Sequence, residues 1–140
     1  MALPGGRSIP EDGNLQRTAI RETWEEVGLN LMKNQCLGVL PQRPIVAKGR
    51  ATGGSVTPYV YYWGVEMPSL AIDPTEIAAA VWIPVWELRH SSNRLFLNPA
   101  KSGLAAKLPA VRSGSRIIWG MTYHVIFELF DRAERYIDDK

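Results

Sequence analysis

The residues best suited to chemistry in this chain are three closely spaced glutamates, Glu22, Glu25 and Glu26. They stand at i, i+3 and i+4, which are neighbouring positions on a helix. At roughly 100° per residue, the three side chains fall within an arc of about 100°. Like charges so placed repel each other and destabilise an isolated helix by about 0.2–0.5 kcal/mol per pair. A hard divalent cation, which prefers oxygen ligands, would offset this repulsion. The spacing therefore indicates a metal-binding face.

The remaining residues of the same helix decide between two interpretations. A run of glutamates is commonly no more than a solvated helix face. Here the opposite side of the helix predicts burial, because it carries a mostly apolar arc formed by Ala19, Ile20, Thr23, Trp24 and Val27. Arg21 borders the acidic arc and can hold a carboxylate through a bidentate contact. Gly28 is expected to end the helix, where a left-handed residue is commonly needed.

Two turns precede this helix and complete a motif. Leu3-Pro4-Gly5-Gly6-Arg7 is a tight turn whose glycines let the backbone approach a ligand closely. In the second turn, residues 10–14, Asp12 or Asn14 can cap the helix. The segment from Gly5 to about Leu31 resembles the Nudix box, usually written G-x5-E-x7-R-E-U-x-E-E-x-G-U, with U a bulky aliphatic residue. The second half is in register at Arg21, Glu22, Glu25, Glu26, Gly28 and Leu29, with Thr23 at the first aliphatic position.

The first half of the box departs from this pattern. Counted from Gly6, the acidic position is Asp12 rather than Glu, and eight residues instead of seven separate it from Arg21. These features resemble the box of coenzyme A diphosphatase-like members of the family. The departure leaves the three glutamates untouched. For Asp12 we expect a hydrogen bond within the turn rather than a direct contact with metal.

The resemblance implies a fold and a reaction. The fold is an α+β arrangement, an α/β/α sandwich with a mixed β-sheet between helices. The reaction is hydrolysis of the diphosphate linkage of a nucleoside diphosphate joined to another moiety, with coenzyme A or a related nucleotide conjugate as the favoured substrate. Carried over by position, the ligands of Mg²⁺ or Mn²⁺ are Glu22, Glu25 and Glu26, with a carbonyl of Gly5 or Gly6. Either Glu25 or Glu26 accepts a proton from water, and Arg21 orients the glutamates.

Two later segments are also similar to family patterns. Glu76-Ile77, followed by residues 81–88 (VWIPVWEL), resembles a stretch in which an acidic residue reaches the metal or acts as a base, so Glu76 is a catalytic candidate. The alternative is a solvated carboxylate beside Asp73. The Ile-Trp-Gly-x-Thr run around Trp119 is similar to the C-terminal segment of coenzyme A diphosphatase-like relatives. Trp119 either stacks on an adenine or is a core aromatic, and the core is favoured.

Composition is typical of a compact enzyme domain. A length of 140 residues suits one domain, and no run approaches the roughly 18 apolar residues of a membrane helix. The 16 basic and 14 acidic residues nearly cancel, so no nucleic-acid partner is expected. The one cysteine, Cys36, is expected in the core and suits a reducing compartment. We expect the cytoplasm, with the peroxisome or mitochondrion as alternatives, and a homodimer stays open.

The chain after the box is expected to alternate between strands and loops. Strands are predicted over 35–40, 55–67 and 78–83, a loop over 41–54, a short helix from Pro84 and an amphipathic helix through apolar positions 118–130. Nudix domains usually place several strands before the box. Because only Met1-Ala2-Leu3 precede the first turn here, we expect a single domain, residues 1–140, that is truncated at its N-terminus.

The sequence leaves other functions open. A non-catalytic Nudix-fold nucleotide-binding module would keep the fold without the chemistry. A Nudix-fold isomerase would need further acid–base residues. Among hydrolases, the alternative substrates are ADP-sugars, dinucleoside polyphosphates and modified nucleoside triphosphates. The basic residues Arg43, Lys48 and Arg50 either contact a 3′-phosphate of the substrate or belong to a solvated loop.

Overall fold

The computed structural model describes residues 1–32, 35–47, 50–98 and 107–138. The chain divides into two compact units, which we describe separately. The acidic unit, Leu3–Pro41 with Thr57–Trp82, holds eight Asp and Glu against four Lys and Arg. The basic unit, Met1–Ala2 with Gln42–Val56 and Ile83–Lys140, holds six Asp and Glu against twelve Lys and Arg. The small net charge of the chain is therefore the sum of a negatively charged unit and a positively charged unit.

The acidic unit is built around helix α1, Leu15–Val27, which follows a 3-10 turn η1, Pro10–Asp12. The side chain of Asn14 caps the helix by accepting a hydrogen bond from the backbone N–H of Arg17 at 2.9 Å. Gly28 ends it with φ 71°, and its N–H donates to the carbonyl of Trp24. Both ends of the helix therefore lie where the sequence predicts them.

The apolar arc of α1 is only partly buried. Thr23 and Val27 are buried, whereas Trp24, which was expected in the core, is 57% exposed. At roughly 100° per residue, Trp24 lies about 60° beyond Val27 around the helix, at the edge of the arc. Whether a residue at the edge of an apolar stripe is buried thus depends on which neighbouring elements cover it.

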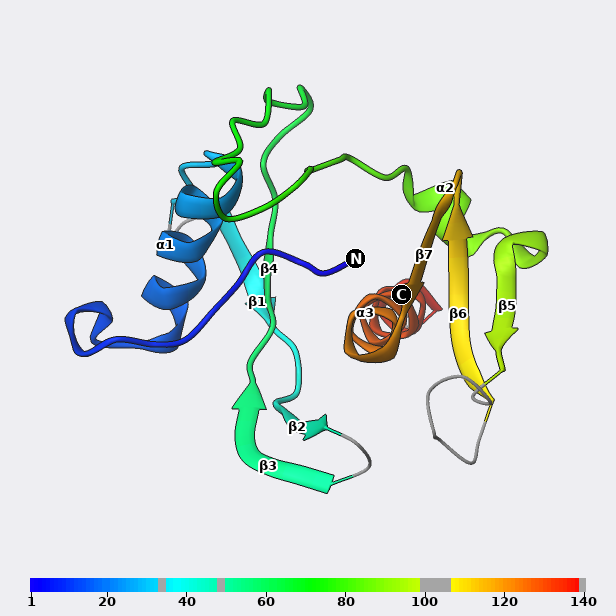
Figure 1. Ribbon diagram of the computed structural model, residues 1–140. Coiled ribbons are helices and arrows are strands. Elements are labelled where there is room, and N and C mark those ends of the chain that lie inside the picture. Colours follow the sequence, from blue (N-terminus) through cyan, green and yellow to red (C-terminus); the bar gives the residue numbers. More distant parts are fainter. Residues whose placement is uncertain (33–34, 48–49, 99–106, 139–140) are drawn as a thin grey trace. The chain divides into compact units, whose positions relative to one another are not determined.

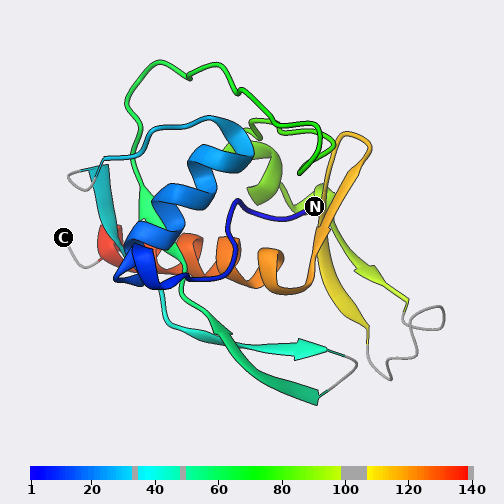
Figure 2. The same cartoon turned by 60° about the vertical axis from the view of Figure 1, so that its left-hand side comes forward.

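Two short strands accompany α1 in both views of the chain (Figures 1 and 2). β1, Cys36–Val39, pairs antiparallel with β4, Tyr59–Tyr61, so that Val39 lies opposite Tyr59. Cys36, expected in the core, is half-buried. After β4 the chain continues without regular structure from 62 to 82, and the N–H of Ala71 ties this segment to α1 by donating to the carbonyl of Val27 at 3.0 Å.

The basic unit contains a hairpin, a three-stranded sheet and two helices. The hairpin joins β2, Arg43–Ala47, to β3, Arg50–Val56. Helix α2, Val85–Arg89, and the 3-10 turn η3, Ser91–Asn93, lead to an antiparallel sheet. The sheet consists of β5, Arg94–Leu97, β6, Leu108–Ser113, and β7, Arg116–Trp119, and helix α3, Gly120–Asp138, follows it. Helix α3 lies against β6 and β7 in both views (Figures 1 and 2).

The core of the basic unit forms where α2 and α3 meet this sheet. Leu88, Val111 and Ile118 are its buried centre, and Tyr123 and Phe127 of α3 pack against them. Val111 and Ile118 face each other across the β6–β7 ladder and are at most 1% exposed. Burial of each such side chain stabilises the fold by roughly 1.5–3 kcal/mol. This unit therefore has a small apolar core of its own.

The α+β class is confirmed, with three differences in detail. The described strands form three separate sheets rather than one mixed sheet, and every pairing within them is antiparallel. The loop expected over 41–54 is largely the β2–β3 hairpin. Its Pro, Gly and basic residues are typical of loops, so the sequence did not indicate the strands. The strand expected over 55–67 is interrupted at Pro58, which has no N–H to donate to a ladder, and it ends at Tyr61.

Two further expectations need correction. Residues 78–83 form no strand, since no neighbouring strand in the described part of the chain pairs with them. The helix expected through positions 118–130 starts later, because Arg116–Trp119 is β7. Gly120, with φ 65°, makes the break between strand and helix. None of the helices that the structure describes combines the length and the apolarity that crossing a bilayer requires.

Candidate functional site

The first glycine turn lies directly against the acidic face of α1. The N–H of Gly5 donates to Oε2 of Glu26 at 3.2 Å. At Gly6, an added Cβ would lie only 2.3–2.5 Å from the carboxylate atoms of Glu22, much closer than side-chain atoms can approach. The backbone therefore comes as near to two of the glutamates as a residue without a side chain allows. The close approach of this backbone to a ligand, which the Gly-Gly sequence predicts, stays a prediction, and the structure shows its approach to the glutamates.

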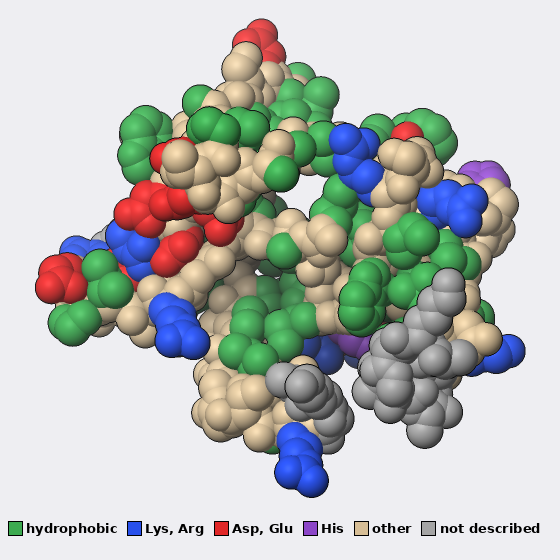
Figure 3. Space-filling view, viewed as in Figure 1, with side chains coloured by type: hydrophobic (Ala, Val, Ile, Leu, Met, Phe, Trp, Pro, Cys, Tyr) green, Lys and Arg blue, Asp and Glu red, His purple; other side chains and the backbone are tan. Residues whose placement is uncertain are grey.

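Arg21 connects the acidic face to the turns before the helix. Its Nη1 donates to Oε2 of Glu25 at 2.7 Å and lies 2.8 Å from Oε1 of Glu22. Its Nη2 donates to the backbone carbonyl of Arg7 at 2.9 Å. A guanidinium that contacts two carboxylates in this way restricts the rotamers of both. Figure 3 shows acidic side chains gathered around basic ones on this part of the surface.

Asp12 holds the other side of the same guanidinium. Nε of Arg21 donates to Oδ1 of Asp12 at 2.9 Å and Nη2 to Oδ2 at 3.1 Å, a bidentate pair. Oδ2 also accepts from the hydroxyl of Thr18 at 2.8 Å and from the N–H of Ile9 at 3.1 Å. Only 5% of the Asp12 side chain is exposed. The hydrogen bond from Arg21 is the main reason why the pKa of Asp12 lies well below its usual range, although burial opposes the shift.

The sequence predicts only part of this contact. It assigned Asp12 a hydrogen bond within the turn, which the N–H of Ile9 provides. It missed the ion pair with Arg21 and the bond from Thr18. The signal that could have revealed them is the Nudix pattern itself, in which an acidic residue precedes the arginine by a nearly fixed distance.

Glu26 lies in a different environment from Glu25. Glu25 is ion-paired with Arg21 and 42% exposed, whereas no basic side chain in the described residues pairs with Glu26. Burial is the main cause that raises the pKa of Glu26; the charges of Glu22 and Glu76 raise it further, and the N–H of Gly5 opposes the shift. Glu76 therefore lies close enough to act electrostatically on Glu26. Of the two proton acceptors left open by the sequence, Glu26 is the one without a cationic partner.

Glu76 reaches this position because its turn is held at two points. The carboxylate of Asp73 accepts from the N–H and the hydroxyl of Thr75, at 2.8 and 2.6 Å. The carbonyl of Asp73 accepts from the N–H of Glu76 at 3.1 Å, and the bond from Ala71 to Val27 ties the same segment to the end of α1. Glu76 is exposed, so its role at the site and the solvated-turn alternative both stay predictions.

The donor chemistry of this face suits a hard divalent cation. In Glu22, Glu25 and Glu26 one carboxylate oxygen contacts Arg21 or Gly5, and the other has no hydrogen-bond donor in the described residues. Carboxylates that bind metals are held by such outer contacts while another oxygen stays available. The side chains have not converged, however, because no three His, Cys, Asp or Glu of the described chain are arranged to hold an ion. The metal ligands therefore stay a prediction.

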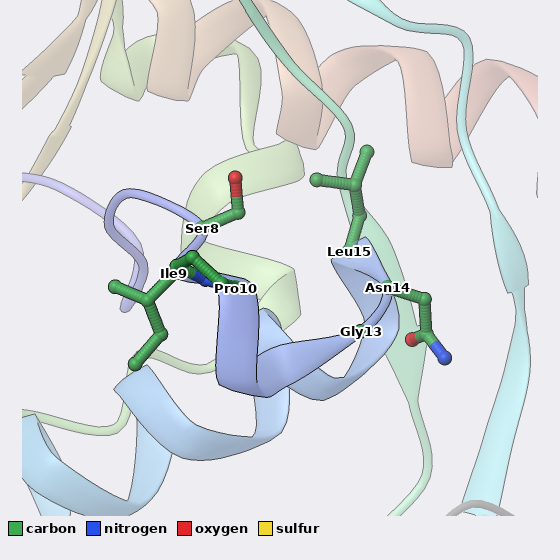
Figure 4. Close-up of a pocket in the computed structure, with 6 residues that line it drawn as sticks. All are labelled: Ser8, Ile9, Pro10, Gly13, Asn14 and Leu15. Atoms are coloured by element: carbon green, nitrogen blue, oxygen red, sulfur yellow. The ribbon is translucent and has the colours of Figure 1, made fainter.

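A shallow depression lies at the other end of α1. It is lined by Ser8, Ile9, Pro10, Gly13, Asn14 and Leu15, and in Figure 4 Asn14 points away from Ser8 and Ile9. No charged side chain lines it. The acidic face near the C-terminal half of the helix, rather than this depression, is therefore the candidate site. Trp119, in the basic unit, is 46% exposed, so its expected place in the core is wrong.

Several known proteins and one domain family match this chain. The NUDIX domain pattern matches residues 1–107, which include α1 and Glu76. An uncharacterized Nudix hydrolase NudL of Photorhabdus laumondii is 31% identical over 136 residues, 96% of this chain and 68% of its own. The mitochondrial coenzyme A diphosphatase NUDT8 of Mus musculus is 30% identical over 131 residues, 92% of this chain and 60% of its own.

A third relative, the mitochondrial coenzyme A diphosphatase NUDT8 of Homo sapiens, is 29% identical over 124 residues, 87% of this chain and 50% of its own. The chain thus spans between half and about two thirds of the length of these curated relatives. No solved structure matches it. The matched domain pattern covers most of the chain, and the glutamates of α1, the arginine that orients them and the glycine turn all lie inside it. The chain therefore belongs to the NUDIX domain family.

Proposed function

We propose that this protein is a metal-dependent pyrophosphohydrolase that cleaves the diphosphate linkage of a nucleoside diphosphate joined to another moiety. Membership of the family and its hydrolase relatives support the reaction class. The names of the mouse and human relatives support coenzyme A, or a related nucleotide conjugate, as the substrate. The observation that carries the proposal is the acidic face of α1, with two of its carboxylates fixed by one guanidinium.

In this proposal Glu22, Glu25 and Glu26 hold Mg²⁺ or Mn²⁺, together with a carbonyl of the Gly5-Gly6 turn. When bound, the ion supplies charge neutralisation on the diphosphate and a lower pKa for the attacking water. Mg²⁺ keeps several waters and uses few carboxylates, so the three glutamates need not bind at once. The oxygens that lack protein donors are the ones available to it.

The other residues of the site act on position and protons. Arg21 keeps the carboxylates of Glu22 and Glu25 together, and Asp12 keeps the guanidinium from turning away. Glu26 is the proposed proton acceptor because no described basic side chain pairs with it, whereas Glu25 is ion-paired with Arg21. Glu76, whose charge reaches Glu26, either assists this proton transfer or adds a ligand.

The test is hydrolysis of coenzyme A and other nucleotide conjugates with and without Mg²⁺, followed by identification of the products. Replacing Glu25 or Glu26 with Gln removes a charge without changing the shape, and we expect activity to fall about 100-fold or more. Glu66→Gln is the matched control, because Glu66 is an exposed glutamate of the same unit that makes no described ion pair. Full activity in Glu25→Gln and Glu26→Gln would contradict the assigned chemistry.

A second candidate is a nucleotide-binding module without catalysis. Binding of coenzyme A without any cleavage, in the presence of Mg²⁺ and Mn²⁺, would support this candidate over the hydrolase. For either function we propose a small nucleotide conjugate as the partner and a cytoplasmic location, with the peroxisome and, in view of the relatives' names, the mitochondrion as alternatives.

A further inference from the structure

A second cluster of charged side chains lies in the basic unit, outside the site described above. Its centre is Glu128 on α3, whose two carboxylate oxygens each accept a hydrogen bond from a different arginine. Nη2 of Arg43, on β2, donates to Oε2 at 3.1 Å, and Nε of Arg132 donates to Oε1 at 2.7 Å. One carboxylate therefore positions two guanidinium groups side by side.

The charges of this cluster do not balance. Two guanidinium groups face the one carboxylate of Glu128, and the charge of Arg135 also acts on it. Of the other acidic residues in this stretch of α3, Asp131 makes no ion pair with any described residue and Glu134 pairs with Arg89. The basic unit as a whole has a net charge of +6, since its twelve Lys and Arg outnumber its six Asp and Glu. The cluster therefore attracts anions.

Several donors of the two arginines remain available. Each guanidinium uses one nitrogen on Glu128, and the other two nitrogens of each have no acceptor in the part of the chain that the structure describes. The side chains of Arg43 and Arg132 are 32% and 49% exposed, so solvent or a ligand can reach these donors. Arginine presents its N–H groups in a fixed planar fork that matches the oxygens of a phosphate group.

A purely structural role explains the cluster less well. An ion pair that only fastens one element to another needs a single arginine for each carboxylate, and Arg89 with Glu134 forms such a pair on the same helix. Exposed ion pairs also add little to stability, about 0–1 kcal/mol. Two arginines on one carboxylate leave a positive charge unbalanced and donors unused, and an anion would satisfy both.

We propose that Arg43 and Arg132, positioned by Glu128, form a binding site for a phosphate monoester, either carried on a nucleotide or free in solution. The proposal does not rest on the hydrolase function, because the cluster contains no residue of the acidic face. It gives the basic unit a ligand of its own.

The experiment uses the whole chain with divalent cations chelated, so that the acidic face repels the probe. Calorimetry at low salt measures the binding of adenosine 5′-monophosphate, with adenosine as the phosphate-free comparison. We expect Arg43→Gln and Arg132→Gln each to weaken binding of the monophosphate about tenfold or more, the worth of one charge-assisted hydrogen bond. The control is Arg112→Gln, because Arg112 is exposed on β6 and has no described partner.

Inorganic phosphate added as a competitor distinguishes the two sources of the ligand. Displacement of the nucleotide assigns recognition to the phosphate alone, and a lack of displacement assigns it to a phosphate on a nucleoside; both support the proposal. Should one variant fail to fold, the other decides the test, together with the NMR signals of the Nε–H groups of the wild-type arginines during titration with the monophosphate. The proposal is overturned if adenosine binds as tightly as the monophosphate, or if the two variants bind like Arg112→Gln.

Discussion

Replacing Gly6 with alanine would force the carboxylate of Glu22 out of its place. The new Cβ would lie 2.3 Å from Oε2 of Glu22, and real Cβ atoms essentially never come closer than 3.0 Å to a neighbour. The carboxylate must therefore retreat by at least about 0.7 Å, the difference between these two distances. Because it is the far end of a flexible side chain, it can move without disturbing the backbone.

This movement should harm catalysis much more than stability. A displacement near 1 Å in a positioned group lowers rates by up to about 100-fold. We therefore expect kcat/KM to fall about 10- to 100-fold in Gly6→Ala, or roughly 1.4–2.7 kcal/mol of transition-state stabilisation. The free energy of unfolding should change by no more than about 0.5–1 kcal/mol, since neither core packing nor a left-handed backbone is involved.

The assay compares this variant with Gly38→Ala. Neither glycine has a positive φ, and an added Cβ at Gly38 meets nothing within 4 Å, so this control makes the same substitution without the clash. Both variants are measured for hydrolysis and for unfolding in urea. In a Glu22→Gln background, Gly6→Ala should reduce activity little further, because both changes act on one carboxylate. A folded Gly6→Ala enzyme with wild-type kcat/KM would refute the argument.

Three further predictions concern stability. Gly28→Ala should lower the free energy of unfolding by roughly 2–5 kcal/mol, because the backbone is left-handed there and the new Cβ would clash with Ala71. Gly114→Ala, where the backbone is also left-handed but no atom lies near the new Cβ, should lower it by about 1–2 kcal/mol. Urea denaturation of the two variants measures the difference. Because the pKa of Asp12 is depressed in the folded protein, its ionised form stabilises the fold above about pH 4, and this contribution is lost as the pH falls. Between about pH 5 and 2, the urea concentration at the unfolding midpoint should therefore fall more steeply for the wild type than for Asp12→Asn. Ile118→Ala should lower the free energy of unfolding by about 2–5 kcal/mol, while the exposed control Ile137→Ala should stay within about 0.5 kcal/mol.

Local signals in the sequence predicted the acidic unit better than the basic one. Helix α1 begins at a capping Asn14 and ends at Gly28, because both signals depend on backbone groups one turn away. The β2–β3 hairpin was missed because its Pro, Gly and arginine residues are typical of loops, and its strands form only by pairing with each other. The break at Gly120 was missed because the apolar spacing continues through it.

Contacts between distant residues were beyond the sequence alone. The order of the glutamates predicted one acidic face, but the effect of Glu76 on Glu26 depends on a loop that returns to α1 through Ala71. The pairing of Arg43 with Glu128 joins residues 85 positions apart, and nothing in the local sequence indicates it. In each case the residue types were visible early, and only the path of the chain brought them together.

The departure from the usual Nudix pattern can be understood from the same contacts. Aspartate is one methylene shorter than the glutamate of the family pattern, and here one extra residue separates it from the arginine. The 3-10 turn Pro10–Asp12 nevertheless brings Asp12 against the helix, where Thr18 and the N–H of Ile9 fix its carboxylate, and both oxygens reach Arg21. The shorter side chain is thus compatible with a bidentate pair because the backbone, rather than the side chain, spans the difference. Any change that keeps this pair should keep Glu22 and Glu25 in place, and this makes the guanidinium, more than the identity of the acidic residue, the feature on which the proposed metal site depends.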